Sequence, residues 1–155
     1  QIRQKIQRLA IEILEENYRE EEIVLAGINN NGMRFARLLE EEMSRQGLVP
    51  VVLTRIRLNP ADPLEREIVV EAGKELLTGK VIVVVDDVAN TGRTIFYACR
   101  PLMDVLPKKV QAAVLVDRTH KSFPIKVDFV GLSLATTLMQ NIDVELEEEA
   151  RVLLN

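Results

Sequence analysis

The chain of 155 residues is 47% hydrophobic and 28% charged, a composition typical of one globular domain with a single core. Its net charge of −4 disfavours binding of nucleic acids over a broad surface, because that function needs an excess of Lys and Arg. A single cysteine, Cys99, excludes an internal disulfide and indicates a reducing compartment. No apolar run reaches the roughly 18 residues that span a membrane, and the first residues do not resemble a signal peptide, so we expect a cytoplasmic protein.

The first third of the sequence predicts helices and buried strands in alternation. Residues 2–18 predict an amphipathic helix, because apolar residues recur there at three- and four-residue spacing, namely at Ile2, Ile6, Leu9, Ala10, Ile13 and Leu14. The elements expected next are a buried strand at 23–28, an Asn-Asn-Asn-Gly turn at 29–32, a helix at 33–46 that stops at Gly47, and a strand at 49–56.

A segment of about 20 residues with weak periodicity follows, and in a compact domain such a segment is usually a functional lid or a mobile excursion. The pairs Asn59-Pro60 and Asp62-Pro63 interrupt regular structure within it, because a residue that precedes proline is driven away from the helical conformation. Residues 68–70 predict a short strand beyond these pairs.

The central stretch of the chain is a run of five β-branched residues at 81–85, followed by Asp86 and Asp87. This composition predicts a strand buried on both faces, with the two acids at its carboxyl end. The elements expected after it are a helix at 95–106 that Pro101 kinks or ends, strands at 110–116 and 127–130, and an edge strand at 142–146. The whole order predicts an α/β fold with a mainly parallel sheet, in which ligands bind at the carboxyl ends of strands.

The loop Thr91-Gly92-Arg93-Thr94 connects the two acids to the next helix. Backbone N–H groups at the start of a helix are unpaired and carry partial positive charge, so this loop suits a phosphate. The carboxylates of Asp86 and Asp87 repel phosphate and suit hydroxyl groups or a metal ion on the same ligand. The stretch therefore predicts a site for a sugar phosphate, and the alternative is a strand-to-helix turn with no ligand.

Residues 82–94 resemble the phosphoribosyl pyrophosphate motif of the type I phosphoribosyltransferases, with four apolar residues, paired acids and a Thr-Gly-x-Thr loop. Residues 113–131 resemble the base-side segment of the bacterial pyrimidine-operon attenuation regulators, which are also uracil phosphoribosyltransferases. The resemblance covers nearly the whole chain. It implies a single phosphoribosyltransferase domain over residues 1–155, with a mainly parallel central sheet, flanking helices, a flexible lid loop and a small base-side hood.

The resemblance also implies an activity, the transfer of the phosphoribosyl group of phosphoribosyl pyrophosphate to a pyrimidine base, with uracil giving UMP. It implies Mg²⁺ as cofactor, held indirectly by Asp86 and Asp87, which also bind the ribose hydroxyls, and it implies a homo-oligomer. The implied catalytic residues are Asp86, Asp87 and Arg57. The 5-phosphate is expected on Ala89, Asn90, Thr91, Gly92, Arg93 and Thr94, the pyrophosphate on Asn29, Asn30, Asn31 and Gly32, and the base at Val116, Asp117 and Arg118.

The chain departs from these families at the expected pyrophosphate loop, where the pyrimidine regulators carry Lys-Thr-Arg before the glycine and this chain carries three asparagines. Asparagine donates hydrogen bonds but supplies no positive charge for pyrophosphate. The same four residues also make a good turn, so both interpretations stay open. Arg57 matches the arginine of the family's Tyr-Arg-Asp-Asp stretch, but Leu58 and Asn59 replace the acids, and Asn90 replaces the acid or tyrosine of other members. The alternative function is therefore a catalytically weak regulator that senses UMP or phosphoribosyl pyrophosphate.

RNA binding is the extension of that alternative. Lys121 and Lys126 keep the basic character of the RNA-binding members, whereas Gln7 and Ile11 replace Thr and His on the first helix. Ile11 is apolar and makes no phosphate contact, so the sequence does not favour RNA as a partner. On the base side, Arg118 is open to a surface ion pair as well as to a base contact, and His120 to a surface role.

Overall fold

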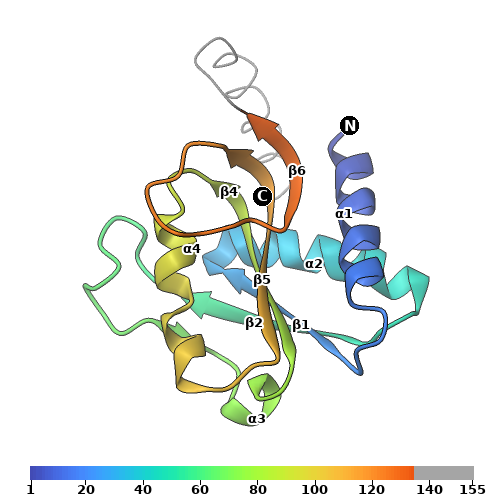
Figure 1. The fold of residues 1–155 in the computed structure, drawn as a ribbon, viewed down its shortest axis with the longest axis horizontal. Coiled ribbons are helices and arrows are strands. Elements are labelled where there is room, and N and C mark those ends of the chain that lie inside the picture. The colour runs from blue at the N-terminus through green and yellow to red at the C-terminus, as the bar shows by residue number, and fades with distance from the viewer. Residues whose placement is uncertain (135–155) are drawn as a thin grey trace.

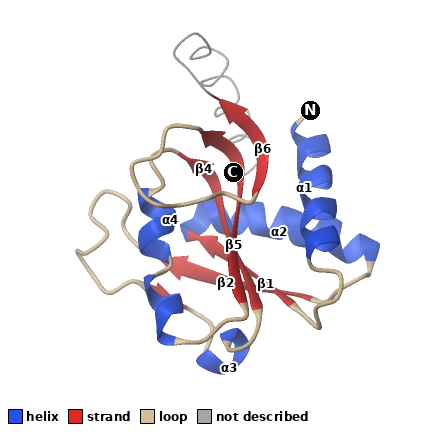
Figure 2. Cartoon of the chain, in the orientation of Figure 1, coloured by secondary structure: helices blue, strands red, loops and turns tan. Residues whose placement is uncertain are grey.

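The computed structural model describes residues 1–134 of the chain (Figures 1 and 2). The expected strand at 142–146 lies outside the described residues. In chain order the elements are α1 (Ile2–Glu16), β1 (Ile23–Ile28), α2 (Asn29–Gln46), β2 (Val51–Arg57), β3 (Val69–Val70), α3 (Lys74–Leu77), β4 (Val81–Ala89), α4 (Arg93–Ala98), the 3-10 helix η1 (Arg100–Asp104), β5 (Lys109–Arg118) and β6 (Phe129–Leu134).

The described strands form one sheet in the order β3-β2-β1-β4-β5-β6. All neighbouring pairs are parallel except β2 and β3, which are antiparallel. The strand order reverses at β1 and β4, which pair in the middle of the sheet although α2, β2 and β3 separate them in the sequence. A crevice opens at the carboxyl ends of strands at such a switch point. The predicted α/β fold with a mainly parallel sheet is confirmed.

Helices cover both faces of the sheet, with α1 and α2 on one side and α4 on the other (Figure 1). The side chains of the central strands alternate between these faces: Leu25 and Val83 pack with α1 and α2, whereas Val24 and Val84 pack with α4. All six residues predicted for the inner face of α1 are buried. None of the helices within residues 1–134 is long and apolar enough to pass through a membrane.

The junction between β1 and α2 differs from the prediction, because the three asparagines and Gly32 form the first turn of α2 and not a turn before it. Asn29 has a φ of 53°, in the left-handed region that asparagine tolerates, and the chain passes directly from strand to helix there. Gly32 permits a close approach, since a Cβ at this position would lie 2.5 Å from the carbonyl oxygen of Val85. This approach sets the start of α2 against β4, one residue before Asp86.

Two further differences concern the elements on either side of the phosphate loop. β4 does not end before the acids but continues to Ala89, because it stays paired with β5 as far as the Ala89–Asp117 register position. The helix expected at 95–106 ends at Ala98, and Pro101 lies in the first turn of η1, as the predicted interruption requires. The four residues of α3 were not predicted, since a helix of this length carries no periodic signal.

Candidate functional site

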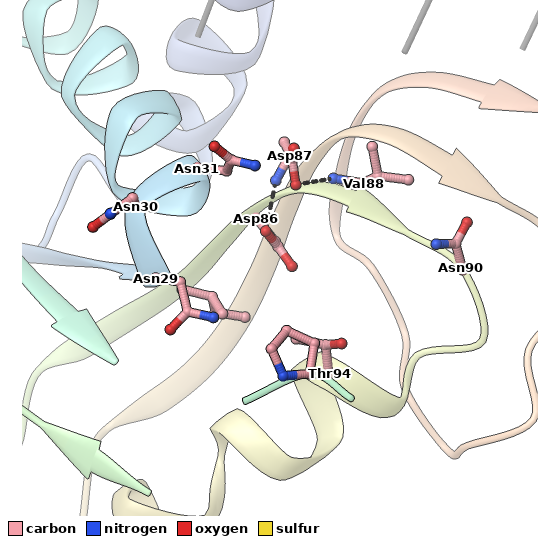
Figure 3. A pocket seen from close by; sticks show the side chains of 10 residues that line it. Asn29, Asn30, Asn31, Asp86, Asp87, Val88, Asn90 and Thr94 are labelled. Atoms are coloured by element: carbon pink, nitrogen blue, oxygen red, sulfur yellow. Dashed lines mark hydrogen bonds between the residues drawn. The ribbon is translucent and has the colours of Figure 1, made fainter. Parts of the chain in front are cut away.

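A cavity of about 440 Å³ opens at the carboxyl ends of β1 and β4, where the strand order reverses. Four separate segments contribute to it: the first turn of α2, the segment after β2, the end of β4 and the loop into α4. Its lining consists of Ile28, Asn29, Asn30, Asn31, Pro60, Asp86, Asp87, Val88, Asn90 and Thr94 (Figure 3). The structure therefore brings together the acids, the asparagines and part of the 5-phosphate loop that the sequence predicted.

The two acids occupy different environments in this cavity. Asp86 is buried, with 8% of its surface exposed, and its side chain points into the space between Asn29 and Thr94 (Figure 3). Its Oδ1 accepts the backbone N–H of Asp87 at 2.9 Å, and Asp87 Oδ1 accepts the N–H of Val88 at 2.9 Å. Burial, and then repulsion by Asp87, raise the pKa of Asp86 well above its ordinary value. A perturbed carboxyl that faces a cavity is typical of a ligand site.

The donor set of this cavity fits Mg²⁺ bound together with a substrate. Within residues 1–134 no cluster of three His, Cys, Asp or Glu side chains forms, so Asp86 and Asp87 are the protein carboxylates that would hold the ion. Magnesium is commonly bound by one or two carboxylates, with phosphate oxygens and water completing its shell. A cation would also offset the repulsion between the two acids, which lack an ion pair with Lys or Arg among the described residues.

The predicted 5-phosphate loop lies against a second cavity of about 380 Å³, which shares Pro60, Val88, Asn90 and Thr94 with the first. All six predicted residues, Ala89 to Thr94, line it. Gly92 has a φ of 89° and precedes α4, which has only six residues. The dipole of such a short helix contributes little to anion binding. The loop N–H groups and the threonine hydroxyls are therefore the groups that suit a phosphate.

Hydrogen bonds hold this loop to the chain that follows β5. The carbonyl oxygen of Thr91 accepts the N–H groups of Ser122 at 3.0 Å and of Phe123 at 3.2 Å. The base-side segment and the phosphate loop therefore form one hydrogen-bonded unit. Val116 and Asp117 pair with Val88 and Ala89 in the sheet, which places them next to the same loop.

The predicted base residues do not line the cavity of the acids. Val116 is buried, and Asp117 Oδ1 accepts Lys121 Nζ at 2.5 Å. Lys121 also donates to the carbonyl oxygen of Arg118. The base-side edge thus contains a lysine that offsets the charge of Asp117, a role that the sequence alone did not indicate.

The asparagines of the first loop line the cavity, but all three side chains already have protein partners. Asn29 Nδ2 donates to the carbonyl oxygen of Leu58 at 2.8 Å, and Asn29 Oδ1 accepts the N–H of Leu58 at 3.1 Å. Asn30 Oδ1 accepts Arg55 Nη1 at 3.0 Å. Asn31 Oδ1 accepts Arg34 Nη1 at 3.5 Å. No Lys or Arg lines this cavity among the described residues.

Arg57, predicted as catalytic, is not brought to the acids. Its Nε donates to Glu71 Oε2 at 2.7 Å across the β2–β3 pair, and both side chains are exposed. It lines a different cavity, together with Leu58 and Asn59.

Two contacts of the site carried no sequence signal. Pro60 lines both cavities, and Arg93 Nη2 donates to the carbonyl oxygens of Pro60 and Ala61, each at 3.0 Å. In the sequence, Pro60 indicates only an interruption of regular structure. Arg93 occupies the variable position of the Thr-Gly-x-Thr motif, so the motif does not predict its side-chain contact.

Comparison with known proteins agrees with this geometry. The family model described as "Phosphoribosyl transferase domain" matches residues 1–149. This chain belongs to the phosphoribosyltransferase family. Phosphoribosyltransferases are pentosyltransferases, so the coarse enzyme class that the sequence predicted is confirmed. The chain is similar to curated family members named "Bifunctional protein PyrR": that of Brevibacillus brevis is 39% identical, covering 95% of this chain and 86% of that protein. The one from Fusobacterium nucleatum is 38% identical, covering 95% and 87%.

Solved phosphoribosyltransferase structures share the fold at low sequence identity. A hypoxanthine-guanine phosphoribosyltransferase from Bacillus anthracis has a TM-score of 0.72 at 20% identity, covering 86% of this chain and 77% of that one. A hypoxanthine-guanine-xanthine phosphoribosyltransferase has a TM-score of 0.66 at 17% identity, covering 86% and 74%. The predicted resemblance to the type I phosphoribosyltransferases, and among them to the pyrimidine regulators, is confirmed.

Proposed function

We propose that this member of the phosphoribosyltransferase family joins uracil to phosphoribosyl pyrophosphate with Mg²⁺, giving UMP and pyrophosphate. The observation that carries the proposal is the convergence of Asp86, Asp87 and the loop at 89–94 around two adjoining cavities at the switch point of the sheet. The choice of uracil rests on the resemblance of residues 113–131 to the pyrimidine regulators, and relatives named PyrR support it.

The proposed reaction displaces pyrophosphate from the anomeric carbon by a ring nitrogen of the base, through a cation-like sugar. Catalysis then depends on position, on charge and on the exclusion of water. The carboxylates of Asp86 and Asp87 accept hydrogen bonds from the ribose hydroxyls, while the N–H groups and hydroxyls of the loop at 89–94 hold the 5-phosphate. Pro60 lines both cavities and contributes apolar surface to them. Bound magnesium supplies neutralisation of the leaving pyrophosphate.

The test is release of pyrophosphate from phosphoribosyl pyrophosphate and magnesium, measured with uracil and with other bases. Release that depends on uracil is expected from the wild-type chain and from Asp104→Asn, a matched control on η1 outside both cavities. Asp87→Asn is expected to lower kcat/KM by about 100-fold, because it removes a charge that acts on the reacting sugar. A wild-type chain that releases no pyrophosphate with any base would refute the proposal.

A second function, a weak catalyst that senses UMP, is favoured by one observation: no cation among the described residues lines the cavity of the acids. Pyrophosphate carries more negative charge than the phosphate of UMP. The absence of a cation therefore weakens binding of pyrophosphate more than binding of UMP. Saturable UMP binding without turnover on any base would support the sensor. RNA binding that weakens with salt would extend it to an attenuator, although Ile11, 43% exposed, occupies the outer face of α1.

Two further properties follow from the family resemblance and are proposals as well. We expect a homo-oligomer, and light scattering on the purified chain would give a molar mass above that of one chain. We also place the protein in the cytoplasm, which localisation of a tagged full-length chain would test.

A further inference from the structure

Residues 58–61 form the start of the segment between β2 and β3, and the last two of them lie against the site. Pro60 lines the cavity of the acids and the cavity of the phosphate loop, and Ala61 lines the latter. We call residues 58–67 the lid segment. Its internal turns are closed by the N–H of Asp62, which donates to Asn59, and by the N–H of Glu65, which donates to Asp62.

One end of the lid segment is held by the first turn of α2. The side chain of Asn29 makes two hydrogen bonds with the backbone of Leu58, one as donor at 2.8 Å and one as acceptor at 3.1 Å. The Asn29 side chain thus pairs with the Leu58 backbone as the backbone of a neighbouring strand would. It connects the residue after β1 with the residue that follows β2. It also directs the Asn29 amide to the lid segment, although the first loop was expected to contact pyrophosphate.

The other hold comes from the phosphate loop. Arg93 Nη2 donates to the carbonyl oxygens of Pro60 and Ala61, each at 3.0 Å, and the side chain is half-buried. Hydrogen bonds from a charged donor are stronger than those between neutral groups. Arg93 also lines the cavity of the phosphate loop, so a phosphate bound by this loop lies next to the residue that holds the lid segment.

The geometry points to Asn29 and Arg93 as positioning residues that hold the lid segment over the ligand from the two loops of the site. This inference rests on the proposed function for the identity of the ligand, but the two holds exist without it. Binding of a mononucleotide orders the loop at 89–94 and, through Arg93, slows opening of the lid segment. Catalysis then depends on both side chains although neither needs to touch the reacting atoms.

Hydrogen exchange on the full chain, with and without UMP, tests this inference. Asn29→Gly keeps the left-handed backbone and removes both hydrogen bonds, so exchange of the Leu58 N–H is expected to rise about tenfold. Arg93→Gln is expected to accelerate exchange at residues 61–65 and to weaken the protection that UMP gives them. Arg93→Lys is expected to restore part of this protection, because an ammonium group donates to both carbonyls. The matched control, Arg45→Gln, breaks only an exposed pair with Glu42 on α2 and is expected to leave the lid segment unchanged.

Exchange at Leu58 and at residues 61–65 that is equal in the wild type, Asn29→Gly and Arg93→Gln would overturn the inference. So would a loss of UMP affinity in Arg93→Gln without faster exchange at 61–65, because that result would place Arg93 on the ligand. Protection of the β4 amides shows in each variant whether the sheet is intact. Failure of the proposed function appears separately, as a wild-type chain that neither binds UMP nor releases pyrophosphate while the ligand-free exchange pattern holds.

Discussion

Replacement of Gly32 by alanine tests how closely α2 must approach β4 for the site to form. An added Cβ would lie 2.5 Å from the carbonyl oxygen of Val85, about 0.9 Å inside the 3.4 Å at which ordinary contact begins. Val85 lies in the central strand, fully buried and paired on both sides, so its backbone has no room to move. The first turn of α2, which contains the asparagines of the cavity, must therefore shift away from the acids.

Two opposing terms decide the sign of the stability change. Alanine in place of glycine inside a helix stabilises it by about 1 kcal/mol, whereas overpacking costs about 1 to 3 kcal/mol. Because the clash is with backbone, we expect the overpacking term to win and the free energy of unfolding to fall by about 1 to 2 kcal/mol. A displacement near 1 Å also predicts a loss of up to about 100-fold in kcat/KM.

Urea unfolding and the pyrophosphate-release assay measure these two effects. Gly73→Ala is the matched control, since its added Cβ meets only the flexible side chain of Glu75 and its φ is −74°. Its free energy of unfolding is expected to change by less than about 0.5 kcal/mol. If Gly32→Ala instead gains about 1 kcal/mol and keeps full activity, the close approach of helix and strand does not limit the site.

Three other predictions follow from burial. Asp86→Asn is expected to raise the free energy of unfolding near pH 7, because the raised pKa means that ionisation of Asp86 is less favourable in the folded chain than in the unfolded chain. Wild-type stability therefore falls as pH rises above about 4, and urea titrations should show the difference between the two proteins vanish toward that pH. Burial raises the pKa of the Cys99 thiol, so a disulfide reagent is expected to label the folded chain at least about tenfold more slowly than the unfolded chain, and equal rates would contradict this. Phe35→Ala removes a fully buried ring between α2 and the sheet and is expected to cost about 3 to 5 kcal/mol in urea unfolding, whereas a cost below about 1 kcal/mol would show that the ring does not belong to the core.

The sequence predicted the elements whose burial leaves a clear hydrophobic pattern. The inner face of α1 consists of the predicted residues, because one-sided burial imposes a regular pattern. β1 has the predicted bounds, because a strand buried on both faces is a continuous apolar run. The start of α2 was not predicted, since Asn and Gly are typical of turns. Here Asn29 adopts a left-handed φ within the first helical turn, and Gly32 serves a close approach. Only the three-dimensional arrangement distinguishes these uses of the same residue types.

The residues of the site also fall into those that the sequence predicts and those that it does not. Asp86, Asp87 and the loop at 89–94 form one contiguous motif, and the structure places them around shared cavities as expected. Arg57 was assigned by its position in a family stretch, and it lies on the β2–β3 pair with Glu71. The contact of Arg93 with Pro60 joins residues far apart in the sequence and depends on the path of the chain between β2 and β3. Patterns within one segment do not predict contacts of this kind.

The pairing of β1 with β4 has a consequence for the lifetime of the folded chain. Ile23 pairs with Val81, which is far away in the sequence, and non-local parallel pairings of this kind form slowly. A ligand that contacts both Asn31, just after β1, and Asp87, on β4, connects these two strands. Such a ligand binds only when the two strands are paired. At a concentration 100 times its dissociation constant, such a ligand adds about 2.7 kcal/mol to stability. The amount of intact protein in a cell would then rise and fall with the supply of the compound that it binds.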